Sequence, residues 1–70
     1  MHKNKILTLR EKEVFDLLAK NIDTEDIADR LCITPKTVRN HISNVIQKLG
    51  VRSRTQAIIE LIKMNEINIH

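Results

Sequence analysis

This 70-residue sequence has little of what usually interrupts or cross-links a chain: one cysteine, one glycine, one proline and one aromatic residue. A single cysteine, Cys32, excludes an intramolecular disulfide framework and is typical of a reducing, cytoplasmic setting. With one glycine and one proline, few sharp turns are possible, which favours helices with short connections over a β fold. Because Phe15 is the only aromatic residue, the core must be built from leucine, isoleucine and valine.

Long apolar runs and ligand-forming sets are also missing. No apolar run approaches the about 18 residues that cross a bilayer, and no signal-peptide core follows the basic N-terminus Met1–Lys5. The residues Cys32, His41, His2 and His70 do not have the spacing of a zinc site. Paired carboxylates occur only where helices are expected to start. The sequence therefore predicts a protein that is not an enzyme and has no cofactor, no metal and no membrane partner.

Charge is distributed unevenly along the chain. Residues 1–34 carry six Lys/Arg and seven Asp/Glu, whereas residues 35–70 carry six Lys/Arg and two Asp/Glu, so net charge changes from −1 to +4. No acidic residue lies between Asp29 and Glu60. A segment of one sign inside a folded domain suggests a polyanionic partner such as nucleic acid. A solvated basic face would give the same pattern, so charge alone leaves both interpretations open.

Capping residues divide the chain into four predicted helices. Thr8 and Glu11 have the spacing of a capping box, which places the start of the first helix at Thr8. That helix is expected to end near Lys20–Asn21, because asparagine tolerates the left-handed conformation that follows a helix. The second helix is short, is capped by Asp23 or Thr24, and precedes a three-residue connection. The expected inward side chains of these helices are Val14, Leu17, Leu18, Ile27, Ala28 and Leu31.

The third and fourth helices have clearer starts. Thr34 caps the third helix, Pro35 takes its first position, where no amide hydrogen bond is lost, and Gly50 ends it. Ser53 and Gln56 have the spacing of a second capping box, which opens the fourth helix. The buried stripe predicted for the third helix consists of Val38, Ile42, Val45 and Leu49.

A short helix, a three-residue turn and a longer helix beginning Thr-Pro form the pattern of a helix-turn-helix. The second helix of this motif enters the major groove, where each base pair presents a distinct pattern of donors and acceptors. With the apolar stripe inward, the opposite face of the third helix carries Lys36, Arg39, Asn40, Ser43 and Gln47. An ordinary amphipathic helix is the alternative, and the lack of carboxylates on this helix argues against it.

Four blocks of sequence, in order over residues 7–57, resemble LuxR-type DNA-binding domains. These blocks are Leu7-Thr8-x-Arg10-Glu11-x-Glu13-Val14, Ile27-Ala28-x-x-Leu31-x-Ile33, Thr37–Asn44 and Lys48-Leu49-Gly50-Val51-x-x-Arg54-x-Gln56-Ala57. The resemblance implies an all-α, four-helix fold that contains a helix-turn-helix, with residues 1–70 as one domain folded over about 7–66. Within the family, the sequence looks especially like a stand-alone regulator of spore formation, without a receiver or ligand-binding domain.

The resemblance also implies roles for individual residues. Base contacts are expected from Arg39, Asn40 and Ser43, and phosphate contacts, which set register, from Lys36, Thr37, Lys48 and Arg54. Backbone amides at the start of the second helix, near Thr24, are a further candidate phosphate site. Glu25 stands where many relatives have lysine, so no phosphate contact is expected from that side chain.

Members of this family dimerise through the fourth helix, which fits the apolar residues that cover most of its circumference. The expected interface consists of Ile59, Lys63 and Met64, and a two-fold dimer would place its recognition helices about 34 Å apart. Alternatively, Ile59 and Met64 cover the N-terminal arm or the tail Ile67–Ile69.

The leading interpretation is a cytoplasmic, nucleoid-associated regulator that binds double-stranded promoter DNA as a homodimer, with RNA polymerase as a candidate further partner. The alternative from another class is a helical protein-interaction module that docks through its fourth helix and regulates another transcription component. A steep salt dependence of duplex binding would separate the two. The terminal helix-turn-helix of a sigma-like factor is a third interpretation, which the Lys48–Val51 segment and the fourth helix disfavour.

Overall fold

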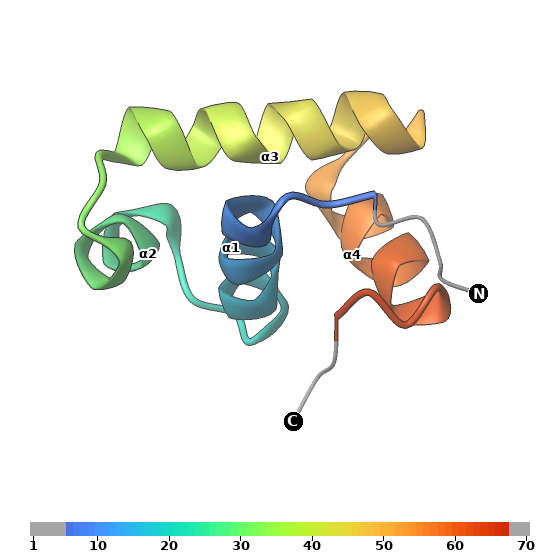
Figure 1. Cartoon of the computed structure of the whole chain (residues 1–70), viewed down its shortest axis with the longest axis horizontal. Helices are drawn as coiled ribbons and strands as arrows, with labels where there is room; N and C mark the ends of the chain where they lie inside the picture. Colours follow the sequence, from blue (N-terminus) through green and yellow to red (C-terminus); the bar gives the residue numbers. More distant parts are fainter. Residues whose placement is uncertain (1–5, 68–70) are drawn as a thin grey trace.

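The computed structural model describes residues 6–67, which form four helices and no strand in that range. The helices are α1 (Leu9–Ala19), α2 (Thr24–Leu31), α3 (Pro35–Leu49) and α4 (Arg54–Lys63). The longest, α3, lies across one side of the molecule, and α1 lies between α2 and α4 beneath it (Figure 1). The predicted all-α, four-helix fold is confirmed.

The capping box at the start of α1 is confirmed. The hydroxyl of Thr8 accepts a hydrogen bond from the Glu11 amide at 3.1 Å, and the Glu11 carboxylate accepts one from the Thr8 amide at 2.9 Å. Two amides that the helix itself cannot satisfy are therefore paired.

The other three helices also begin at side chains that accept from their first turns. Asp23, rather than the next residue, caps α2, and Thr34 caps α3 directly before the proline. Ser53 caps α4 by accepting from the Gln56 amide at 3.2 Å. The Gln56 side chain, however, accepts from the Arg52 amide and not from Ser53, so the predicted second capping box forms only in part.

Left-handed residues end the helices. Asn21 has φ 67°, as expected from its position after α1, and Gly50 after α3 has φ 69°. The turn between α2 and α3 contains a non-glycine residue of this kind, Cys32, with φ 59° and an exposed side chain. A Cβ atom in this conformation costs about 1–2 kcal/mol.

Gly50→Ala is expected to lower the free energy of unfolding by about 1–2 kcal/mol. The added Cβ would meet nothing within 4 Å, so the cost arises from the left-handed backbone alone. Urea unfolding measures the change, and Cys32→Gly is the matched control, because it relieves the same conformation and should not destabilise the chain. Unchanged stability in Gly50→Ala would contradict this account of the cap.

The core is aliphatic around one aromatic ring. Phe15 is fully buried and stands on the inner stripe of α1, where Leu17, predicted for that role, is only half-buried. Ile67, beyond the end of α4, is also buried. The remaining buried apolar side chains are Leu7, Val14, Leu18, Ile27, Ala28, Val38, Ile42, Val45, Ala57 and Leu61. These contacts fix α3 with its opposite face directed outward.

Candidate nucleic-acid interface

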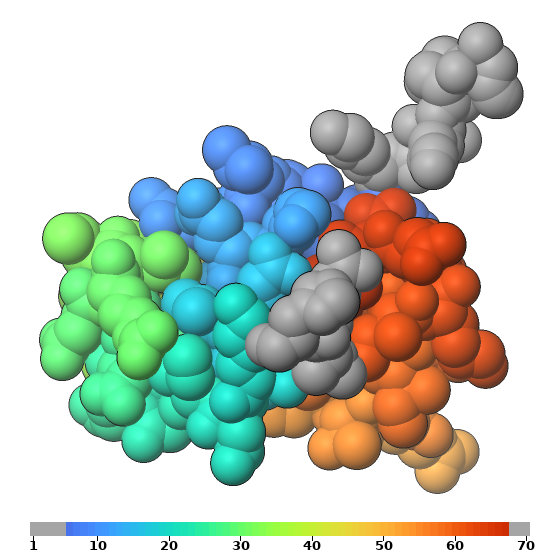
Figure 2. All heavy atoms as spheres, turned by 90° about the horizontal axis from the view of Figure 1, so that it is seen from below, coloured from blue at the N-terminus to red at the C-terminus, as the bar shows by residue number. Residues whose placement is uncertain are grey.

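The outer face of α3 is polar along its whole length. Val38, Ile42 and Val45 face the core, and α3 contains no carboxylate. On the side opposite α3, the surface consists of α1, α2, α4 and their connections (Figure 2). The exposed polar side chains of α3 are Lys36, Arg39, Asn40, Ser43, Asn44, Gln47 and Lys48. The predicted outward orientation of this face is confirmed.

Arg39, Asn40 and Ser43, the predicted base contacts, lie on adjacent turns of α3 and are all exposed. Within residues 6–67, none of the three side chains takes part in an ion pair or in a hydrogen bond. The structure therefore brings them together without giving them another role, and their contact with bases stays a prediction. Asn44, one turn beyond Asn40, belongs to the same face and was missed, although its spacing of four residues from Asn40 could have indicated it.

The predicted phosphate contacts fall into different environments. Lys36 is exposed in the first turn of α3. Thr37 is half-buried, and its hydroxyl lies 3.0 Å from that of Thr34 within the cap of α3. Arg54 is exposed at the start of α4. Lys48, in the last turn of α3, has a partner inside the protein.

Arg54 and the start of α2 open onto one hollow. Asn21, Asp23 and Thr24 line it from the α1–α2 turn and α2, and Arg54 and Thr55 line it from α4. Arg54 and Thr24, where phosphate contacts are predicted, thus line the same hollow. Asp23 also lines this hollow, and its carboxylate caps α2 by accepting from the Asp26 amide.

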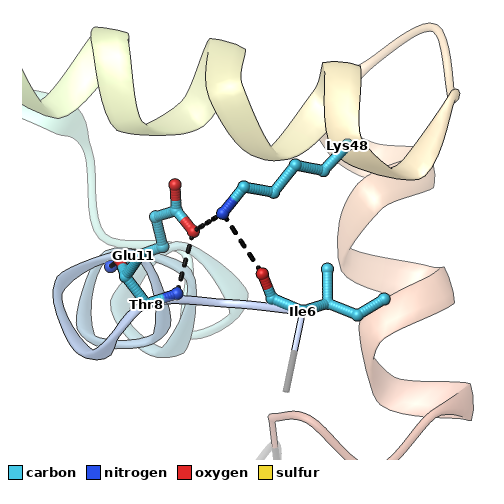
Figure 3. Close-up of polar contacts among 4 residues, drawn as sticks. All are labelled: Ile6, Thr8, Glu11 and Lys48. Atoms are coloured by element: carbon cyan, nitrogen blue, oxygen red, sulfur yellow. Dashed lines mark hydrogen bonds and ion pairs between the residues drawn. The ribbon is translucent and has the colours of Figure 1, made fainter. Parts of the chain in front are cut away.

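Lys48 contacts a buried carboxylate on α1. Its ammonium nitrogen lies 2.5 Å from Glu11 Oε1 and donates to the Ile6 carbonyl oxygen at 3.2 Å (Figure 3). Only 3% of Glu11 is exposed. Burial raises the pKa of this carboxyl group, but hydrogen bonds from Lys48 and Thr8, together with the charges of Lys48 and His41, hold the pKa below its ordinary value of 4.5. Glu11 is therefore an ionised partner for Lys48 at neutral pH.

Several cations on α3 and in the segment that follows it have no such partner. The other ion pairs of the described residues are local: two join neighbours on α1, and one joins Glu60 to Lys63 on α4. Within the same range, no carboxylate pairs with Lys36, Arg39, Arg52 or Arg54. The charge asymmetry expected from the sequence thus includes unneutralised cations on α3 and at the start of α4.

The three residues predicted to form an interface, Ile59, Lys63 and Met64, are all exposed. Ile59 is 50% exposed and Met64 40%, and Lys63 is exposed as well. Ile67 packs into the core instead of covering them. The remainder of the tail, residues 68–70, and the basic N-terminus, residues 1–5, lie outside the described residues.

A short helix, a three-residue turn and a long helix with a carboxylate-free outer face define a helix-turn-helix protein. A model of the bacterial regulatory proteins of the luxR family matches residues 5–61. The chain belongs to this family and is a transcription regulator, not an enzyme. In residues 6–67 no helix is long and apolar enough to cross a membrane, and no group of three metal-binding side chains occurs.

Individual relatives agree with this assignment. The chain is 55% identical over 64 residues to the spore germination protein GerE of Bacillus subtilis (strain 168), which covers 91% of the chain and 86% of GerE. It is 44% identical over 64 residues to the transcriptional regulatory protein DegU of Brevibacillus brevis, and this alignment covers 91% of the chain but only 27% of DegU. A solved structure of the transcription factor GerE superimposes with a TM-score of 0.93 at 52% identity, covering 96% of the chain and 100% of GerE. The predicted similarity to LuxR-type domains and to a spore-formation regulator is confirmed.

Proposed function

We propose that this chain regulates transcription by binding promoter DNA as a homodimer, with α3 of each protomer in the major groove. The observation that carries the proposal is the exposed, carboxylate-free outer face of α3. An α-helix fits the major groove, and an acid-free face avoids repulsion by the phosphates on either side.

Each polar residue of this face suits a different contact. The Arg39 guanidinium group can donate two hydrogen bonds to O6 and N7 of one guanine, which makes it the strongest candidate for reading sequence. Asn40 can pair with adenine, and the Ser43 hydroxyl can donate or accept. Lys36, Thr37 and Arg54 are proposed to contact phosphates, whereas Lys48 could do so only by leaving the Glu11 carboxylate.

The exposed side of α4 supports dimerisation. Ile59 and Met64 present apolar surface to solvent with Lys63 beside them, and a second copy of α4 would cover it. Two-fold symmetry would set the two recognition helices in successive major grooves, about 34 Å apart.

The relatives support a setting for the proposed function. Because GerE is named for spore germination, the target genes are proposed to belong to spore formation or germination. The protein would act in the cytoplasm on the nucleoid, where a promoter-bound dimer would lie next to RNA polymerase.

The salt dependence of duplex binding tests the proposed function. Sites are first selected from random duplex DNA, and the dissociation constant is then measured by fluorescence anisotropy across about 50–200 mM salt. With two cationic phosphate contacts, Lys36 and Arg54, in each protomer, a dimer is expected to give a logarithmic slope of about −4, because each cationic contact releases counterions. A slope near zero, or no duplex binding, would favour a protein-interaction module.

A further inference from the structure

Glu11 and Lys48 form a contact that joins distant parts of the chain. Lys48 Nζ lies 2.5 Å from Glu11 Oε1, across a separation of 37 residues, and 3.2 Å from the Ile6 carbonyl oxygen, across 42 residues. Glu11 Oε1 also accepts from the Thr8 amide at 2.9 Å. Figure 3 shows Lys48 extending from α3 to the start of α1 and the segment before it. One ammonium group therefore holds three elements together.

This contact differs from the other ion pairs of residues 6–67. Those three pairs join residues three or four apart on one helix, and all of their side chains are at least 31% exposed. Exposed local pairs of this kind stabilise a protein little. Glu11, by contrast, is 3% exposed, and an ionised carboxylate without a partner at such a position is strongly destabilising. The pairing with Lys48 is thus needed to keep Glu11 buried.

The same contact changes what Lys48 can do on DNA. The charge of Lys48 is already balanced by Glu11. If the ammonium group bound a phosphate instead, Glu11 would be left as an unpaired buried carboxylate, which would destabilise the protein. Lys36, at the other end of α3, is exposed and has no carboxylate partner among the described residues. The two lysines on one helix therefore have different electrostatic environments.

We propose that Glu11 and Lys48 are positioning residues that fix the C-terminal end of α3 against α1, and that Lys48 is not a phosphate ligand. The proposal rests on the DNA binding proposed above. The core holds α3 through Val38, Ile42 and Val45, with Leu49 packed against it in the last turn, and the ion pair adds a polar attachment of that last turn to α1. With both ends fixed, α3 presents its outer face at one angle, which places Arg39 and Ser43 correctly in the groove.

The test compares Lys48→Met with Lys36→Met, which removes an unpaired cation from the same helix. Lys36→Met is expected to reduce the salt slope by about one for each protomer that loses a phosphate contact. Lys48→Met is expected to leave the slope unchanged while weakening specific binding roughly three- to tenfold at every salt concentration. Binding is measured at a temperature at which circular dichroism shows each variant to be folded.

Glu11→Gln gives a result of opposite sign under the two hypotheses. It keeps the shape of the side chain and frees Lys48, so a positioning role predicts weaker specific binding although the protein becomes more positive. A phosphate role for Lys48 predicts tighter binding and a steeper slope. If Lys48→Met does not fold, the double variant Glu11→Gln/Lys48→Met, which buries no unpaired charge, carries the same comparison with Lys36→Met.

Amide hydrogen exchange tests the positioning role without DNA. In Glu11→Gln, exchange is expected to accelerate in the last turn of α3 relative to its first turns, because the last turn loses its ion pair with α1. Uniform exchange along α3, or a loss of slope in Lys48→Met equal to that in Lys36→Met, would overturn the proposal. If the wild-type chain bound no duplex, the proposed function would be overturned. The hydrogen-exchange result would then decide whether the ion pair fixes the last turn of α3.

Discussion

Arg39→Ala is expected to weaken binding to the preferred duplex by about 1–3 kcal/mol, which is roughly 5- to 150-fold, and to remove the preference at one base position of each half-site. The effect should be on recognition alone. The Arg39 side chain is exposed and, in the part of the chain that the structure describes, has no ion-pair partner. Its removal should therefore leave the free energy of unfolding unchanged. Fluorescence anisotropy on duplexes that carry each of the four bases at each position measures the change.

Lys36→Ala provides the matched control for Arg39→Ala. Both variants remove one cation from the outer face of α3, but a phosphate contact carries no sequence information. Lys36→Ala should therefore weaken binding to all duplexes by a similar factor and leave base preference intact. If Arg39→Ala behaved in the same uniform way, Arg39 would be a phosphate ligand and the base-reading role would have to move elsewhere on the helix.

Ile59→Glu is expected to separate the dimer and to weaken DNA binding by about 100-fold or more. The second half-site is bound at high effective concentration only while the two protomers are linked. A carboxylate in place of the exposed Ile59 of α4 would be buried against its symmetry mate in the proposed dimer, where two like charges meet. Sedimentation equilibrium reports the dimer, and anisotropy on full and half sites reports the affinity.

Leu9→Glu controls for the added charge in Ile59→Glu. Leu9 is 75% exposed on α1, so the substitution makes the same chemical change on a different surface. Both variants should keep the helical circular dichroism of the wild type, and Leu9→Glu should lose only the small affinity that one extra negative charge costs. If both variants lost the same DNA affinity and kept the oligomeric state of the wild type, α4 would not form the dimer interface.

The features that the sequence predicted correctly are those with local causes. A threonine before a proline starts a helix, and a glycine after an apolar stripe ends one, because each residue acts on the backbone next to it. The boundaries of α3 and the outward direction of Arg39 and Ser43 follow from such signals. Once three buried positions fix the orientation of an α-helix, the helical periodicity determines the direction of every other side chain.

The contact between Glu11 and Lys48 could be predicted only in part. Glu11 is in line with Val14, Phe15 and Leu18 at spacings of three, four and seven residues, so its position on the buried stripe indicated a carboxylate that needs a partner. The capping box already gives this carboxylate one partner, the Thr8 amide. Which cation pairs with Glu11 depends on how α3 crosses α1. Lys48 is 37 residues away in sequence, and no local sequence pattern predicts how two helices that far apart cross.

Methylation interference on a selected duplex tests most directly whether α3 reads the major groove. Methyl groups on guanine N7 lie in the major groove, whereas those on adenine N3 lie in the minor groove. We expect methylation of guanine N7 to block binding in two clusters about one helical turn apart, and methylation of adenine N3 within those clusters to have little effect. Interference confined to adenine N3, or no interference from any base, would contradict the placement of the outer face of α3 against the edges of base pairs.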